Sequence, residues 1–336
     1  MKRQTMDSMA MRAAILSLAA AACAHEPPVP APAGPPSGAG DAVSAYTGSR
    51  LLLGDELAVE LMDPNAPDRY NTGVRFTPVA GVIRAVSGGR EYLMHRAAHD
   101  PLTDVAGLFA EFDLVTPPPG FAEAAVGEPF VKIGVGALVK GAPDYRFYVP
   151  HKAVKLADTT ATWAKTSAVF TQTLAAVNGY GYNLQAKVNV AGRTLAIEWT
   201  LRNTGAKPFE THQYAHNCIA FDNAATRPGT VVAFPFDFTA RKLGPEQQQV
   251  GREIRFEREL ANSANIDVDY PAGYAGANAL SVFNATTGLR VGCETSIPGS
   301  RVALHAASVY VCPEQFVVIR LPPGASRTWT RQYRFH

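Results

Sequence analysis

The sequence predicts an all-β protein whose main part, residues 45–336, is a single domain built as a large antiparallel β-sandwich. Beyond about residue 51, short apolar runs rich in β-branched and aromatic residues recur every ~8 to 15 residues, with polar turns between them. The C-terminal segment 327–335 also alternates, with Trp329, Tyr333 and Phe335 on one face together with Arg327 and Arg331. No stretch of about 12 residues has clear helical periodicity, and residues 245–260 are ambiguous between helix and loop.

The expected strands follow one another along the chain. Residues 73–96 are expected to form a strand, a turn, a second strand, a Gly-Gly hairpin and a third strand. A strand at 107–115 ends at the Pro-Pro-Pro-Gly turn 117–120. The remaining strand segments are expected at 130–141, 145–156, 161–174, 181–205, 209–223, 231–238, 309–324 and 327–335.

The N-terminal region predicts export. Residues 1–24 have a basic start, a short apolar run and small residues before a polar chain, and the run is too short to span a bilayer. Two cleavage sites compete: a lipobox-like sequence that would lipidate Cys23, and an ordinary A-x-A site at residues 22–24. Residues 25–44 are rich in Pro, Ala and Gly, which is typical of an extended spacer. We therefore expect a periplasmic protein, tethered to a membrane if Cys23 carries a lipid.

Composition narrows the classes of function. Of the 336 residues, 47% are hydrophobic and 18% are charged, as in globular proteins. The net charge of +2 arises at the N-terminus, and the rest of the chain has no excess of basic residues. Nucleic acid is therefore not an expected partner. If Cys23 is removed or lipidated, Cys218, Cys293 and Cys312 remain. They allow three single disulfide pairings, each leaving one free thiol, and export permits any of them.

The most informative stretch is the segment 209–223, which reads FETHQYAHNCIAFDN. Successive side chains of a strand face opposite sides, so His212, Tyr214, His216 and Cys218 share one face. Strand-like segments flank the stretch on both sides, which places the two histidines in the middle of a sheet rather than on a loop. A titratable face at such a position points to water or to a ligand.

Two other interpretations of the histidines exist. Either histidine could be structural, hydrogen-bonded to the backbone. A zinc site is disfavoured because His212 and His216 would lie roughly 13 Å apart along a strand, too far for one ion. We expect neither a metal nor an organic cofactor.

Glu314 lies in the apolar segment 309–324, directly after Pro313. Burying a carboxylate is costly unless it is paired or functional. Desolvation would raise the pKa of Glu314 and make it a better base near neutral pH. The alternative is a glutamate that reaches solvent at a strand break.

Three further residues could line a ligand site. Glu111 shares its strand with apolar neighbours and is either functional or structural. Lys132 has the strand parity of Gly134 and Gly136, which could form a smooth floor under a sugar or simply allow tight packing or a bulge. Arg75 could anchor a ligand hydroxyl or be an ordinary exposed arginine.

Several catalytic motifs are absent from the sequence. It contains no G-x-S-x-G, no P-loop, no H-E-x-x-H and no paired C-x-x-C. Serine hydrolysis, nucleotide chemistry and zincin-type proteolysis are therefore disfavoured.

The order of five segments resembles the galactose mutarotase-like superfamily, and in particular exported bacterial proteins related to aldose 1-epimerases. The resemblance covers about residues 45–336. The segments that carry it are 73–93, 107–115, 127–140, the Asn-Thr-Gly turn at 203–205 followed by 214–223, and 311–335. Their order and spacing are more specific than any one of them.

This resemblance implies a large antiparallel supersandwich and the interconversion of sugar anomers. In that chemistry a glutamate removes the proton of the anomeric hydroxyl and a histidine protonates the ring oxygen, without metal or organic cofactor. By position, Glu314 matches the glutamate and His216 the histidine. The family's loop of the form Asn-x-Leu-His-Gly corresponds to residues 106–111, which contain no histidine. His212 could substitute for it, Glu111 and Lys132 could supply part of the polar lining, or the protein acts on something other than simple sugars.

The sequence therefore yields three hypotheses, all with a sugar or oligosaccharide as ligand. The first is an aldose 1-epimerase-like enzyme. The second is a carbohydrate-binding protein without turnover, and the third is an oligosaccharide lyase or hydrolase on the same fold. The catalytic pair is expected to be His216 and Glu314, with hydroxyls oriented by His212, Tyr214, Arg75, Glu111 and Lys132.

Overall fold

The computed structural model describes residues 42–114 and 116–336 of the chain. Within these residues the regular elements are antiparallel β-strands and a 3₁₀ turn, η3 (Phe221–Asn223), and there is no α-helix. The all-β class expected from the sequence is confirmed. The expected export signal 1–24 with Cys23, and the expected spacer up to residue 41, lie outside the described residues. In the described part of the chain, no helix has the length and apolarity needed to cross a membrane.

The first large sheet carries the candidate site. Its strand β13 lies in the middle, between β5 and β21, so the expected mid-sheet position of the histidines is confirmed. In spatial order its strands are β1 (Ser49–Leu53), β2 (Leu57–Met62), β3 (Val82–Ser87), β5 (Leu108–Phe112), β13 (Phe209–Asn217), β21 (Tyr310–Leu321), β20 (Arg301–Ala307) and β17 (Ala264–Val268), with β4 (Arg90–Glu91) paired to β3.

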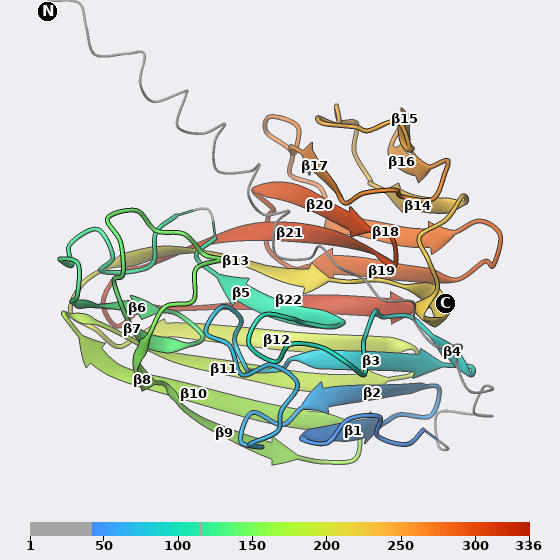
Figure 1. Cartoon of the computed structure of the whole chain (residues 1–336). Coiled ribbons are helices and arrows are strands. Elements are labelled where there is room, and N and C mark those ends of the chain that lie inside the picture. The colour runs from blue at the N-terminus through green and yellow to red at the C-terminus, as the bar shows by residue number, and fades with distance from the viewer. Residues whose placement is uncertain (1–41, 115) are drawn as a thin grey trace, which may run out of the picture. The chain divides into compact units, whose positions relative to one another are not determined.

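The second large sheet packs against the first (Figure 1). In spatial order its strands are β15 (Gln247–Val250), β16 (Glu253–Phe256), β14 (Thr230–Ala233), β18 (Asn278–Asn284), β19 (Arg290–Thr295), β22 (Ser326–Phe335), β12 (Thr194–Asn203), β11 (Tyr180–Ala191), β10 (Ser167–Val177) and β9 (Asp158–Trp163). A third, small sheet consists of β6 (Pro129–Lys132), β7 (Gly136–Val139) and β8 (Ala153–Leu156).

Alternating side chains of the two large sheets form one hydrophobic core. On β12, Leu195, Ile197 and Trp199 are buried while their neighbours are partly exposed. Trp199 lies opposite Trp329 of β22, and the two indole rings stack with their centroids 6.3 Å apart. Burial of such apolar faces is the main favourable contribution to folding. The sandwich predicted from the alternation is confirmed.

Three expected strands are wrong in part, each beside a proline. Residues 73–79 form bends that lead to Pro78, and residues 145–150 are irregular up to Pro150, so that only β8 remains of the expected 145–156 strand. The strand expected at 231–238 ends at Ala233, before Pro235. Proline has no backbone N–H to donate to a neighbouring strand, which explains these ends.

Two other expectations change because a glycine turns the chain. Residues 130–141 form two strands, β6 and β7, joined by a turn in which Gly134 has φ +81°. The ambiguous segment 245–260 is a hairpin of β15 and β16 that turns at Gly251, with φ +57°. Glycine adopts positive φ without steric cost.

Candidate active site

The ladder between β13 and β21 is interrupted at Pro313. The strands pair up to Gln213 opposite Val317 and meet again at the bridge between Ile219 and Val311. Pro313 lies in the gap and cannot donate a hydrogen bond, so the pairing lapses around it. Both paired stretches share one register, so the side chains in the gap still face each other across the two strands.

Two of the cross-strand pairs in this gap, both on the outer face of the first sheet, belong to the candidate site. The rings of Tyr214 and Phe316 stack with centroids 4.4 Å apart. In the next pair, His216 Nε2 lies 3.1 Å from Glu314 Oε1. Two residues about a hundred positions apart in the sequence, singled out by strand parity and by burial, are therefore in direct contact.

A charged network from β5 and the bend before Pro78 surrounds this pair. Glu111 lies opposite Tyr214 in the β5–β13 ladder and accepts a hydrogen bond from the tyrosine hydroxyl. Arg75 Nε donates to Glu111 Oε2 at 2.9 Å, and Arg75 Nη2 lies 3.3 Å from both the Tyr214 hydroxyl and His216 Nε2. The guanidinium of Arg75 thus links the buried carboxylate to the histidine.

Lys132 belongs to the most buried part of this network. Its ammonium donates to Glu111 Oε1 at 3.4 Å and to the hydroxyl of Tyr145 at 2.9 Å. The suggested smooth floor beside Lys132 is wrong, because Gly134 is in a turn and Gly136 begins the next strand. Lys132 is nearly fully buried, so it contributes its charge from the protein interior and does not line a surface.

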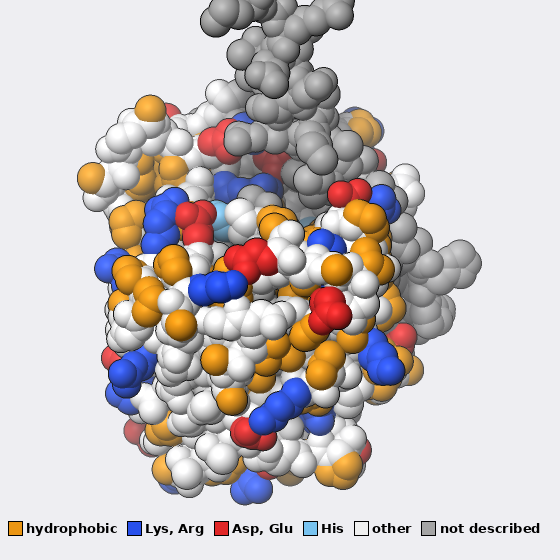
Figure 2. All heavy atoms as spheres, turned by 90° about the vertical axis from the view of Figure 1, so that its left-hand side faces the viewer, with side chains coloured by type: hydrophobic (Ala, Val, Ile, Leu, Met, Phe, Trp, Pro, Cys, Tyr) orange, Lys and Arg blue, Asp and Glu red, His pale blue; other side chains and the backbone are white. Residues whose placement is uncertain are grey.

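The network opens to solvent at one end. The exposed fraction of the side chain falls from 25% for Arg75 through 17% for His216 and 9% for Glu314 to 0% for Glu111. A ligand would therefore approach from the side of Arg75 and His216. On the face shown in Figure 2, histidine side chains are visible between charged side chains of both signs.

The environment places one proton on the pair of Glu314 and His216. Burial raises the pKa of Glu314 to about 8, although the nearby charge of Arg75 opposes the shift. Burial, together with the charges of Arg75 and His305, lowers the pKa of His216 well below its ordinary value. At neutral pH the carboxyl is therefore protonated and the imidazole neutral, so the pair contains an acid beside a base.

His212 lies on the same strand face but outside this network. Its Nδ1 is 3.2 Å from Thr116 Oγ1, and among the described residues no hydrogen bond links it to Glu111, Tyr214 or Arg75. Burial lowers the pKa of His212. Its role in orienting a substrate stays a prediction.

Aromatic residues that the sequence did not single out complete the site. Phe76 packs edge-on against the His216 ring, with centroids 4.8 Å apart. The guanidinium of Arg75 lies 4.6 Å from the rings of both Phe76 and Phe147. Phe147 and Tyr145 belong to residues 145–150, which were expected in a strand but are irregular, so strand parity could not place them. Only their aromatic content, unusual for a loop, could have indicated them.

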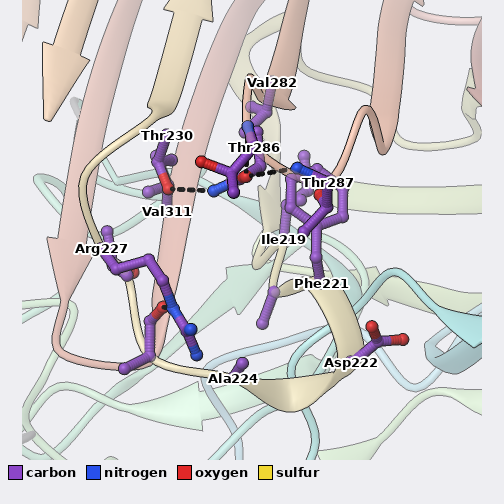
Figure 3. Close-up of a pocket in the computed structure, with 14 residues that line it drawn as sticks. Ile219, Phe221, Asp222, Ala224, Arg227, Thr230, Val282, Thr286, Thr287 and Val311 are labelled. Carbon is purple, nitrogen blue, oxygen red and sulfur yellow. Dashed lines mark hydrogen bonds between the residues drawn. The ribbon is translucent and has the colours of Figure 1, made fainter.

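A separate cavity of about 190 Å³ lies beyond the end of β13, and Figure 3 shows it. Its polar groups bond to one another: Asn284 Nδ2 lies 3.5 Å from Thr230 Oγ1, and Asn284 Oδ1 accepts the backbone N–H groups of Thr286 and Thr287. It contains no histidine, and its carboxylate Asp222 is held by Arg90. Ligand pockets typically exceed ~300 Å³. The cluster around His216 is therefore the better candidate for chemistry.

Comparisons with known proteins identify the fold. No protein-family model matches the sequence, and no curated protein matches it. A galactose mutarotase related enzyme from Lactobacillus acidophilus superposes with a TM-score of 0.55 at 10% identity over 86% of this chain and 97% of its own. A galactose mutarotase-like protein from Lactobacillus casei gives a TM-score of 0.53 at 11% identity over 86% and 100%. The GalM/aldose epimerase homologue from C. elegans gives 0.50 at 12% identity over 86% and 98%. The chain has the galactose mutarotase-like fold.

Proposed function

We propose that this protein is a carbohydrate-active enzyme of the aldose 1-epimerase type, which interconverts the α and β anomers of a sugar. The observation that carries the proposal is the contact between His216 Nε2 and Glu314 Oε1, 3.1 Å apart at the partly open end of a buried charged network. Anomer exchange needs one group to take a proton from the anomeric hydroxyl and another to give a proton to the ring oxygen. A protonated carboxyl beside a neutral imidazole meets both needs.

The protonation states of Glu314 and His216 suggest which of the two acts as the base and which as the acid. The resemblance to the superfamily assigns the base to Glu314 and the acid to His216. In the free protein the shared proton lies on Glu314, so either it crosses the 3.1 Å contact before reaction or the two roles are exchanged. In both cases the active form is the pair with one proton, because ring opening and ring closing each use one acid and one base.

Arg75 adds a hydrogen-bond donor to this pair. The superfamily's additional histidine would fall at Phe109, which pairs with His216 across the β5–β13 ladder. Arg75 places its guanidinium 3.3 Å from His216 Nε2 and is the most exposed charge of the network. We propose that Arg75 takes the place of that histidine, donating hydrogen bonds to the sugar oxygens on which negative charge develops.

A second candidate function is carbohydrate binding without turnover. The observation that favours it is the same direct contact of His216 and Glu314, which leaves no room for a sugar ring between the two groups. Catalysis requires the contact to separate, whereas a binder can keep it. The sugar would then lie over the partly exposed guanidinium of Arg75, which packs against the rings of Phe76 and Phe147.

Polarimetry decides between the two functions. Freshly dissolved α-glucose and α-galactose, followed with wild type and with Glu314→Gln, should show faster mutarotation only with wild type, with a loss of about 10²- to 10⁴-fold in the variant. Binding to the same sugars, followed by thermal shift, tells a binder from an inactive protein. Equal rates for the two proteins, with binding retained in both, would reject the enzyme.

The pH dependence provides a second test of the shared proton. The rate should fall above a pH of about 8, where Glu314 loses the proton that the pair holds, and should persist well below the ordinary pKa of histidine, because His216 resists a second proton. A rate that instead rises from acid pH to a plateau above pH 8 would contradict this assignment.

We also propose that the protein is exported, on the basis of residues 1–24. Fractionation of cells that produce the full chain, with mass spectrometry of the mature N-terminus, would tell lipidation at Cys23 from ordinary cleavage. Recovery of the intact N-terminus in the cytoplasm would refute export.

A further inference from the structure

Two of the three cysteines of the body meet beside the candidate site. Cys218 and Cys312 form the cross-strand pair that follows His216 and Glu314, and their Sγ atoms lie 3.1 Å apart. Both side chains are buried, 2% and 1% exposed, in a small apolar cluster with Met94. The chemistry proposed above leaves this pair unused.

The backbone geometry at this pair suits a covalent bond. Ile219 and Val311 exchange both backbone hydrogen bonds, at 2.9 and 3.0 Å, so the preceding pair, Cys218 and Cys312, is of the non-hydrogen-bonded kind. The N–H of Cys218 accordingly donates away from β21, to the carbonyl of Gly107. Residues in such pairs have Cα atoms ~4.5 Å apart, within the range that a disulfide spans.

The third cysteine has no part in this arrangement. Cys293 lies on β19 in the second large sheet, opposite Leu280 and Tyr333, and its side chain is buried in the main core. Cys218 and Cys312 are on the outer face of the first sheet. The fold therefore selects one of the three pairings that the sequence leaves open.

We propose that Cys218 and Cys312 form a disulfide bond that joins β13 to β21 next to His216 and Glu314. The two thiols lose two protons and two electrons, and a disulfide oxidant, either a small-molecule disulfide or a disulfide-bonded oxidoreductase, accepts them and becomes two thiols. The bond forms during folding, before the strands close over it, because both thiols are inaccessible in the folded protein. Burial and the neighbouring Cys218 also raise the pKa of the Cys312 thiol, which makes it unreactive once folded.

A metal ion is the competing occupant, because the ligand atoms of His216, Cys218 and Cys312 lie within 4.8 Å of one another. The geometry favours the disulfide. Two sulfurs bound to a tetrahedral zinc at ~2.3 Å are about 3.8 Å apart, wider than the observed 3.1 Å. The Nε2 atom of His216 already faces Glu314, and the charge of Arg75 beside it opposes a cation.

Peptide mapping tests the bond directly. The full chain is produced in an oxidising compartment, denatured without reductant in the presence of iodoacetamide, and digested. We expect a cross-linked peptide, two hydrogen atoms lighter than its separate parts, that contains Cys218 and Cys312, with Cys293 alkylated. Alkylation of both Cys218 and Cys312 would overturn the proposal, and stoichiometric zinc that a chelator must remove before alkylation would replace it with a metal site.

Thermal unfolding measures what the bond contributes. Wild type that has been unfolded and refolded in reductant should have a Tm about 5 to 15 °C below that of the oxidised protein, because the bond closes a loop of 94 residues (312 − 218). The double variant Cys218→Ala, Cys312→Ala should not respond to reductant, whereas Cys293→Ala should respond like wild type. A reductant effect that persists in the double variant, or is absent from wild type, would contradict the bond. Neither readout uses sugar turnover, so this inference can fail or hold independently of the proposed activity.

Discussion

The two faces of β13 both bury polar side chains, but they do so in different ways. On the inner face, which meets β22, Gln213 accepts two hydrogen bonds from the Arg331 guanidinium, and Asn217 accepts one from the Tyr333 hydroxyl. On the outer face, the strand presents Tyr214 and His216 to Arg75 and to the carboxylates. Adjacent residues of one strand therefore belong to two separate networks.

The difference lies in the groups that can exchange protons. Arg331 is 2% exposed and its partners are the neutral groups of Gln213, Gln315 and Thr295, so the inner network joins the two sheets with no carboxylate or imidazole among these residues. The outer network contains Glu314, whose pKa is raised to about 8, and is open to solvent at one end. Perturbed titratable groups at a partly open site are typical of catalysis, whereas a closed network without carboxylates or imidazoles is typical of structure.

The largest expected effect is on turnover. His216→Gln should lower the rate of anomer exchange by about 10²- to 10⁴-fold, because the pair loses one of its two proton-transfer groups. His99→Gln, at a half-buried histidine outside both networks, is the matched control and should retain the rate. Polarimetry of both variants at equal concentration of folded protein measures this. An unchanged rate in His216→Gln would remove the outer network from catalysis.

The next effect is on stability at the outer face. Glu111→Gln should lower the free energy of unfolding by about 3 to 5 kcal/mol, since Arg75 and Lys132 would lose the carboxylate that both of them contact. The exposed pair of Glu123 and Lys207 offers a control, and Glu123→Gln should change stability far less than Glu111→Gln, because solvent screens this pair. Urea denaturation gives both values. Equal effects in the two variants would show that burial of the charges has no influence.

A smaller effect is expected at the inner face. Arg331→Met should cost about 1 to 3 kcal/mol, because only neutral partners are left without a hydrogen bond. The rate per folded molecule should stay that of wild type, which separates this network from the site. A fall in rate comparable to that of His216→Gln would mean that the two faces are coupled.

The smallest effect concerns pH. The pKa of Glu314 is raised in the folded state, so between pH 4.5 and about 8 the folded protein binds more protons than the unfolded chain, and stability falls as pH rises. Glu314→Gln removes this dependence and should be more stable than wild type by about 2 kcal/mol at pH 6, with no gain at pH 4. Urea denaturation at both pH values checks it, with Glu294→Gln, at a partly exposed glutamate that pairs with Arg334, as control. A stability difference that does not grow with pH would contradict the raised pKa.

The sequence alone predicted those features that depend on neighbouring residues. Strict alternation defined β12, β13 and β22, and the Gly-Gly pair defined the hairpin of β3 and β4, because side-chain parity and turn geometry are local properties. Parity also selected His216, and an apolar surrounding selected Glu314. Where the prediction was wrong, a proline outweighed the apolar pattern at residues 73–79, 145–150 and 234–238, and a glycine did so at residues 133–135.

Only the tertiary structure decided which of these residues meet. The contact of His216 with Glu314, and that of Cys218 with Cys312, depend on the register of two strands that are separated in the sequence by five strands of the second sheet. The position of Arg75 over Glu111 depends on a bend without periodicity. Local pattern tells which face a side chain takes, but long-range pairing is set by the packing of the whole core, which no short window of sequence contains.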